Sequence, residues 1–158
     1  HGPQRETGNM DGGVSLLLLG DGSGQFQAIL PATSGLLVSG DGTSVTTSDL
    51  NRDGRADILV GVNNGNVESF ENQSQFNSTA IRLPVLAKKR NYVDAKIWVH
   101  FFDDSVQLHE ISAGGGYLSQ SAPIVFVGHG DGRHRVKSIH VRWPNGTTEK
   151  IHDFNTEI

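Results

Sequence analysis

The chain has 158 residues and a formal net charge of −4, and hydrophobic residues make up 35% of it. That composition is typical of a folded protein, and the length suits one domain or two small ones. The absence of cysteine excludes disulfides and thiolate metal sites. The longest apolar run, Leu16–Leu19, is far too short to span a bilayer. The acidic balance argues against nucleic-acid binding, because the phosphate backbone would be repelled.

The charge is unevenly distributed. Residues 1–76 contain 3 basic and 9 acidic residues, whereas residues 77–158 contain 10 and 8. The first part also holds 13 of the 20 glycines. We therefore predict two modules, residues 1–76 and residues 77–158, which meet within the polar stretch Asn72–Thr79.

Short runs of β-branched and aromatic residues mark the expected elements of the first part. They predict strands over Val14–Leu19, Gln25–Leu30, Ser44–Ser48, Ile58–Val62 and Val67–Glu71. The connectors 20–24 and 63–66 are rich in Gly and Asn, the residues that accept positive φ in hairpin turns. No helical periodicity is visible, so we expect no helix.

The second part shows the same pattern with clearer alternation. We predict strands over Ala80–Leu86, Ile97–Phe102, Val106–Ile111, Ile124–Val127, Val136–Trp143 and Thr148–Phe154. Alternate positions place two apolar sets each on one face, namely Ile97, Val99 and Phe101, and Ile139, Val141 and Trp143. Asp103-Asp104 and Asn145-Gly146 are expected to close hairpins, the second as a two-residue turn.

The clearest candidate site is the loop from Asp49 to Asp57. Its oxygen-bearing side chains stand at positions 1, 3, 5 and 9 (Asp49, Asn51, Asp53 and Asp57), and position 7 offers the main-chain carbonyl of Arg55. Calcium prefers six to eight oxygen ligands in a flexible shell, and a glycine after the fifth position allows the sharp bend. The spacing therefore predicts a calcium site. The alternative is a solvated acidic turn.

An EF-hand does not fit this loop. Position 12 is Val60 instead of Glu, and the residues after Asp57 predict a strand where an EF-hand has a helix. The loop is therefore expected to join two adjacent strands. A second calcium site at Asp21 or Asp41 stays open, although Gly-Asp-Gly is commonly a simple turn.

Two stretches resemble known families. Residues 46–62, Thr-Thr-Ser-Asp-Leu-Asn-Arg-Asp-Gly-Arg-Ala-Asp-Ile-Leu-Val-Gly-Val, resemble the VCBS/FG-GAP repeat of integrin-α-like β-propellers. The second part resembles the ASPIC and UnbV C-terminal domain, through Gly-Tyr-Leu-Ser-Gln-Ser at 116–121 and Val-Arg-Trp-Pro-Asn-Gly at 141–146. The first resemblance implies blades of about four strands with calcium in the acidic loop. A propeller needs roughly four to eight blades, so the parent chain is expected to supply further repeats.

These inferences give an all-β fold class. We expect partial β-propeller blades with an Asp-rich calcium loop, followed by a small antiparallel β-sandwich or barrel-like domain.

Catalytic chemistry finds no support in the sequence. No Gly-x-Ser-x-Gly elbow or His-Glu-x-x-His spacing occurs, so we expect no enzyme and no catalytic residues. In the glycine-rich segment 114–121, Tyr117 and Gln120 have either a ligand-binding or a loop-anchoring role, with the anchoring role favoured.

The histidines form two weak candidates. His100 and His109 lie in neighbouring predicted strands, where they would face each other as a zinc site. His129 and His134 flank Asp131 in a glycine-rich loop, which is either a small polar pocket or, as we favour, a solvent-facing turn.

The sequence therefore predicts a calcium-binding, non-catalytic structural, adhesion or interaction module of an exported or cell-surface protein. Its expected partner is a protein or glycan at the cell surface, and its expected location is extracellular or on the cell surface. The alternative is a carbohydrate-binding accessory module of a larger secreted enzyme, in which Trp98 or Trp143 would provide an aromatic platform.

Overall fold

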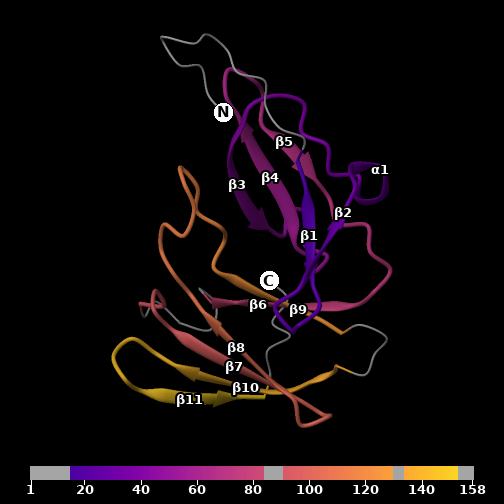
Figure 1. Ribbon diagram of the computed structural model, residues 1–158. Helices are drawn as coiled ribbons and strands as arrows, with labels where there is room; N and C mark the ends of the chain where they lie inside the picture. Colours follow the sequence, from indigo (N-terminus) through magenta and orange to yellow (C-terminus); the bar gives the residue numbers. More distant parts are fainter. Residues whose placement is uncertain (1–14, 84–90, 130–133, 153–158) are drawn as a thin grey trace.

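The computed structural model describes residues 15–83, 91–129 and 134–152, and these ranges form an almost entirely β structure (Figure 1). The strands are β1 Leu17–Gly20, β2 Phe26–Ile29, β3 Gly42–Ser48, β4 Asp57–Val62, β5 Glu68–Phe70, β6 Ser78–Arg82, β7 Lys96–Phe101, β8 Val106–Glu110, β9 Ile124–Gly128, β10 Val136–Arg142 and β11 Thr148–Ile151. Each predicted strand overlaps one of them. The expected ends at Val14, Pro84–Leu86 and Phe154 lie outside the described residues.

One element departs from the prediction. A four-residue helix, α1, spans Pro31–Ser34. Proline occupies its first turn, where the missing N–H costs nothing, and Gly35 ends it with a left-handed φ of 72°. A single turn is too short to show helical periodicity, which is why the sequence pattern did not reveal it.

The first part contains a hairpin and a small sheet. β1 and β2 pair antiparallel, and β3, β4 and β5 form a three-stranded antiparallel sheet in that order. Within its described residues, 15–76, the buried hydrophobic residues are Val38 and Val60. This part therefore has little core of its own.

The second part is a two-layer sandwich. A four-stranded antiparallel sheet has the order β11-β10-β7-β8, and β6 pairs with β9 in a second sheet. The core between them contains Ile81, Leu83, Ala95, Ile97, Val99, Phe101, Val125, Val127, Ile139, Val141 and Trp143. The two apolar sets predicted from alternation both point into this core, which confirms that assignment.

The turn after β10 is longer than expected. Trp143 and Thr147 pair through a main-chain bond of 2.8 Å, which leaves a three-residue loop, Pro144–Gly146, with Gly146 at a φ of 85°. Proline favours the first position of a type I turn, and the glycine takes the left-handed position that follows. Pro144 thus explains why the Asn-Gly pair does not form a two-residue turn here.

The two parts meet along strand β3. The Thr47 carbonyl accepts the N–H of Ala122 at 2.9 Å, and the Thr46 hydroxyl donates to the Gln120 carbonyl at 2.7 Å. In Figure 1 the connection between β8 and β9 rises to the sheet that contains β3. These hydrogen bonds therefore tie the first sheet to the second module.

Adjacent residues of β7 test the sandwich. Ile97 is fully buried, whereas Trp98 lies on the opposite, solvent-facing side of the sheet. Ile97→Ala should lower the free energy of unfolding by about 2–5 kcal/mol, because it removes buried methyl groups and leaves a cavity. Trp98→Ala should lower the free energy of unfolding by a clearly smaller amount. Urea unfolding of both variants checks this, and equal losses would contradict the assignment of faces.

Candidate functional site

The predicted loop connects β3 to β4. Ser48 and Asp57 are directly paired across the two strands, so the loop reverses the chain between them. Arg52 and Gly54 both have left-handed backbone conformations, with φ of 63° and 83°. Glycine adopts this conformation without a steric penalty, which accounts for Gly54 at this bend.

Asp49 opens the loop with a side chain that is fully buried. Its Oδ1 accepts the N–H of Asp53 at 3.0 Å, and its Oδ2 accepts the N–H of Gly54 at 3.2 Å. Oδ2 also accepts a hydrogen bond from the guanidinium of Arg82, which forms an ion pair with it. Main chain and cation together compensate the cost of burying this carboxylate.

Asp57 closes the loop and is also fully buried. Its two carboxylate oxygens accept main-chain N–H groups, from Leu50 at 2.8 Å and from Asn72 at 2.9 Å. One bond holds the start of the loop and the other holds the chain beyond β5. Asp57 therefore fixes the loop to the segment that leads into the second module.

The two middle positions form a more exposed group. Asn51 donates to Asp53 Oδ2 at 2.8 Å, and Arg55 reaches the same oxygen with its guanidinium. The N–H of Arg55 donates to Asp53 Oδ1, and this bond is the main reason why the pKa of Asp53 lies below its usual value. Arg55 Nε also donates to the carbonyl of Asn72 at 2.8 Å.

Arg82 is a site residue that sequence reasoning missed. It lies in β6, 33 residues after Asp49, and its strand belongs to the second module. Ser78, at the start of the same strand, donates to the Gly54 carbonyl at 2.7 Å. No local spacing links these residues to the loop, so only the fold brings them together.

The donor chemistry of the loop suits a hard cation, but its carboxylates do not converge in this arrangement. In the described ranges, no three His, Cys, Asp or Glu side chains lie close enough together to hold a metal ion. Asp49 and Asp53 are paired with arginines instead. Four oxygen-bearing side chains and one main-chain carbonyl nevertheless stand in one short loop, and carboxylates that bind with both oxygens, or water, would complete the six to eight ligands of calcium.

Tyr117 and Gln120 occupy different surroundings in the glycine-rich segment. Gln120 Oε1 accepts the N–H of Gly114, and its Nε2 donates to the carbonyls of Ser112 and Ser121 at 3.3 and 3.1 Å. It holds the segment together from within. Tyr117 is 78% exposed at the tip, so it is not buried in a core.

The fold separates the candidate histidines. His100 pairs with Val106 and His109 with Ile97, so the two imidazoles lie on opposite faces of the sheet. His129 bonds the Thr79 hydroxyl at 2.8 Å. His134 lies 3.0 Å from a carboxylate oxygen of Asp103, and Asp131 lies outside the described residues.

Asp21 forms a simple turn. Its carboxylate accepts the N–H and hydroxyl of Ser23, both at 2.8 Å, and the N–H of Gln25 at 3.2 Å. The bonds to Ser23 lower the pKa of Asp21. They close the β1–β2 hairpin from within.

Substitution of Asp57 tests its main-chain role with a chelator present. Asp57→Ala leaves the N–H groups of Leu50 and Asn72 without their acceptor, and each lost hydrogen bond to a charged group costs about 1.5–3 kcal/mol. Asp57→Asn keeps one acceptor and should lose less stability. Chemical denaturation measures both. If Asp57→Ala unfolds like the unmodified chain, this role is wrong.

Two family models match the chain. The model for the FG-GAP-like repeat matches residues 7–60, and the model for ASPIC and UnbV matches residues 86–157. The first match includes the acidic loop up to β4, and the second covers most of the sandwich. No curated protein matches the chain significantly. The order of the two matches confirms the arrangement that the sequence resemblance indicated.

Proposed function

We propose that this chain is a non-catalytic interaction module of an exported or cell-surface protein. The proposal is supported by the match to an FG-GAP-like repeat followed by the match to ASPIC and UnbV. We further propose that calcium in the acidic loop stabilises it. FG-GAP-like repeats are typical of extracellular proteins and of protein–protein contacts, which supports both the location and the role. No helix in the described part of the chain is long and apolar enough to cross a bilayer.

The apolar surface of the first part is the observation that carries the interaction role. Large hydrophobic side chains on and around the β1–β2 hairpin are exposed, namely Leu16, Leu18 and Leu19 at 52%, Phe26 at 69%, Leu30 at 65% and Leu37 at 57%. An open, largely apolar cavity of about 510 Å³ lies beside them, between Leu16, Val45, Val60 and Tyr117. Large hydrophobic side chains exposed together in one part of a protein are typical of protein interaction sites. Further repeats of the parent chain or a separate protein would cover this surface.

Calcium would act at the loop by replacing the arginines. The ion would be held by the side chains of Asp49, Asn51, Asp53 and Asp57 and by the main-chain carbonyl of Arg55. Its positive charge is more concentrated than that of a guanidinium, so it can draw several carboxylates together. The two buried carboxylates stand at the facing ends of β3 and β4. Their neutralisation would hold these strands together.

Thermal unfolding tests calcium binding. At a hundredfold excess over its dissociation constant, a ligand of the folded state adds about 2.7 kcal/mol. In a protein of this size each kcal/mol raises the melting temperature by roughly 2–4 °C. Calcium should therefore raise the melting temperature by several degrees relative to a chelator, and Asp53→Ala should abolish the rise.

Asp21→Ala is the matched control for this experiment. It removes the carboxylate of a different tight turn, the one formed by Gly20-Asp21-Gly22. The calcium-induced rise should survive this substitution. Identical melting curves with calcium and with chelator would overturn the calcium proposal.

Arg82→Gln tests the competition between arginine and calcium. Removing the guanidinium leaves the buried Asp49 carboxylate without its ion-pair partner, so the metal-free protein should become less stable. Calcium should then bind more tightly and raise the melting temperature further than in the unmodified chain. Arg142→Gln removes an equal charge from the outward face of β10 as the control. Unchanged calcium affinity in Arg82→Gln would show that the two cations do not compete.

The alternative of a carbohydrate-binding accessory module depends on an exposed tryptophan. Trp143 is 2% exposed and belongs to the core, so it is not a platform. Trp98 lies on the outward face of β7 and keeps a carbohydrate interaction open.

A further inference from the structure

The outward face of the four-stranded sheet combines one tryptophan with basic side chains. Because side chains alternate along a strand, the burial of Ile97 and Val99 places Trp98 on the outside of β7. Strand pairing sets Trp98 opposite His140 of β10 on one side and opposite Leu108 of β8 on the other. Lys150 of β11 pairs with His140. One row across the sheet is therefore Lys150, His140, Trp98 and Leu108.

The next row adds charge beside the tryptophan. Across the same four strands, the next row of paired residues is Thr148, Arg142, Lys96 and Glu110. Lys96 Nζ lies 3.5 Å from Glu110 Oε2 in an exposed ion pair. With Lys150, the two rows carry three basic residues and one acidic residue, on a chain whose net charge is −4. This face is therefore positive in an otherwise acidic protein.

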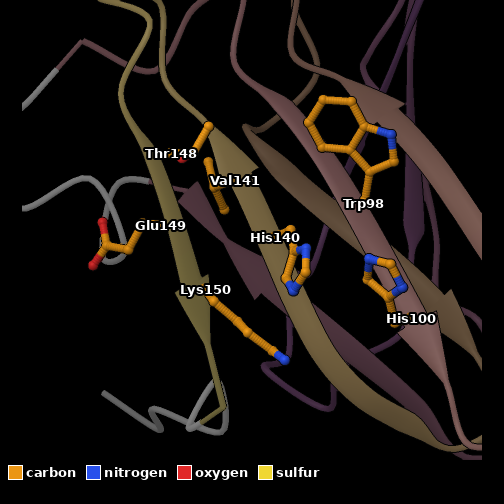
Figure 2. Close-up of a pocket in the computed structure, with 7 residues that line it drawn as sticks. All are labelled: Trp98, His100, His140, Val141, Thr148, Glu149 and Lys150. Carbon is orange, nitrogen blue, oxygen red and sulfur yellow. The ribbon is translucent and has the colours of Figure 1, made fainter.

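A shallow cavity of about 510 Å³ lies on this face. Its lining includes Trp98, His100, His140 and Lys150. Figure 2 shows the rings of His100 and His140 side by side, with Glu149 pointing away from them. The two imidazole rings have centroids 4.4 Å apart. His140 Nε2 is buried and has no hydrogen-bond partner within the described residues. A buried polar atom without a partner is uncommon in folded proteins, and it marks this part of the cavity as one whose hydrogen bonding the chain itself leaves incomplete.

We propose that this face binds an acidic oligosaccharide of the uronate type, with a sugar ring against Trp98 and carboxylates against Lys150 and His140. Aromatic rings provide a flat apolar surface with low conformational entropy, and the neighbouring cations match the charge of the sugar acid. The inference gives a partner chemistry to the interaction role proposed above and rests on it, but it uses a different site from the acidic loop.

The geometry favours a sugar over a peptide. β7 and β10 are central strands whose main-chain groups pair with neighbours on both sides. Strand addition, a common mode of peptide recognition, would place a peptide along the open edge of β8 or β11 and not across Trp98 on this face. A sugar acid needs only a ring surface and cations, which these residues provide.

The affinity should depend on pH through His140. Burial is the main cause that lowers its pKa, followed by the positive charges of His100, Lys150 and His152. A bound carboxylate would favour the protonated imidazole, so binding takes up a proton. Affinity for the sugar acid should consequently fall as the pH rises through the lowered pKa of His140, which lies below the ordinary value of 6.5, and His140→Asn should flatten this dependence.

The test uses the full chain and hexagalacturonate, titrated by calorimetry with a chelator present. Trp98→Ala should weaken binding at least tenfold, and Lys150→Gln should weaken it several-fold. Phe26→Ala removes an exposed aromatic ring from β2 in the first part, and Arg52→Gln removes a positive charge from the loop between β3 and β4. Both controls should bind as tightly as the unmodified chain.

Matched probes decide the outcome. Methyl-esterified hexagalacturonate has the same rings without charge and should bind at least tenfold more weakly, as should poly-glutamate, which has the charge without the rings. Absence of hexagalacturonate binding, or equal binding of either probe, would overturn the proposal. Calcium-induced stabilisation measured on the same preparation separates the two proposals, because failure of either one leaves the other measurement intact.

Discussion

The structure depends on two carboxylates that are buried where its two parts meet. Asp49 and Asp57 stand at the facing ends of β3 and β4, and a buried charge is stable only when it is paired or hydrogen bonded. Their partners include Asn72 from the connecting segment and Arg82 from β6. The acidic loop is thus a joint as well as a turn, because the first sheet cannot keep these partners unless the second module is in place.

This joint lies between two surfaces of different chemistry. The first part exposes leucine and phenylalanine side chains over a small core, which suits a protein partner or further repeats. The second part has a complete core and presents Trp98 among basic residues on its outer face. A cation at the loop would therefore stabilise the connection between the two surfaces for which we propose binding.

Strand positions were predictable because a period of two is a local property of the sequence. Alternation alone placed Ile97 and Trp143 each on one face with their apolar neighbours, and the structure buries both of these faces. The helix α1 escaped prediction because one turn shows no period. Spacing also predicted which oxygen-bearing residues of the loop would bind calcium, and this stays a prediction. It gave no sign of Arg82, since the ion pair with Asp49 spans 33 residues and exists only in the folded chain.

The buried Asp49 carboxylate needs a cation, and we propose that either Arg82 or calcium provides it. A crystal structure grown at saturating calcium tests this requirement most directly. We expect an ion at about 2.3–2.6 Å from oxygens of Asp49, Asn51, Asp53 and Asp57, with Arg82 withdrawn from Asp49. A loop that keeps the Arg82–Asp49 pair and holds no ion under those conditions would contradict the exchange of arginine for calcium.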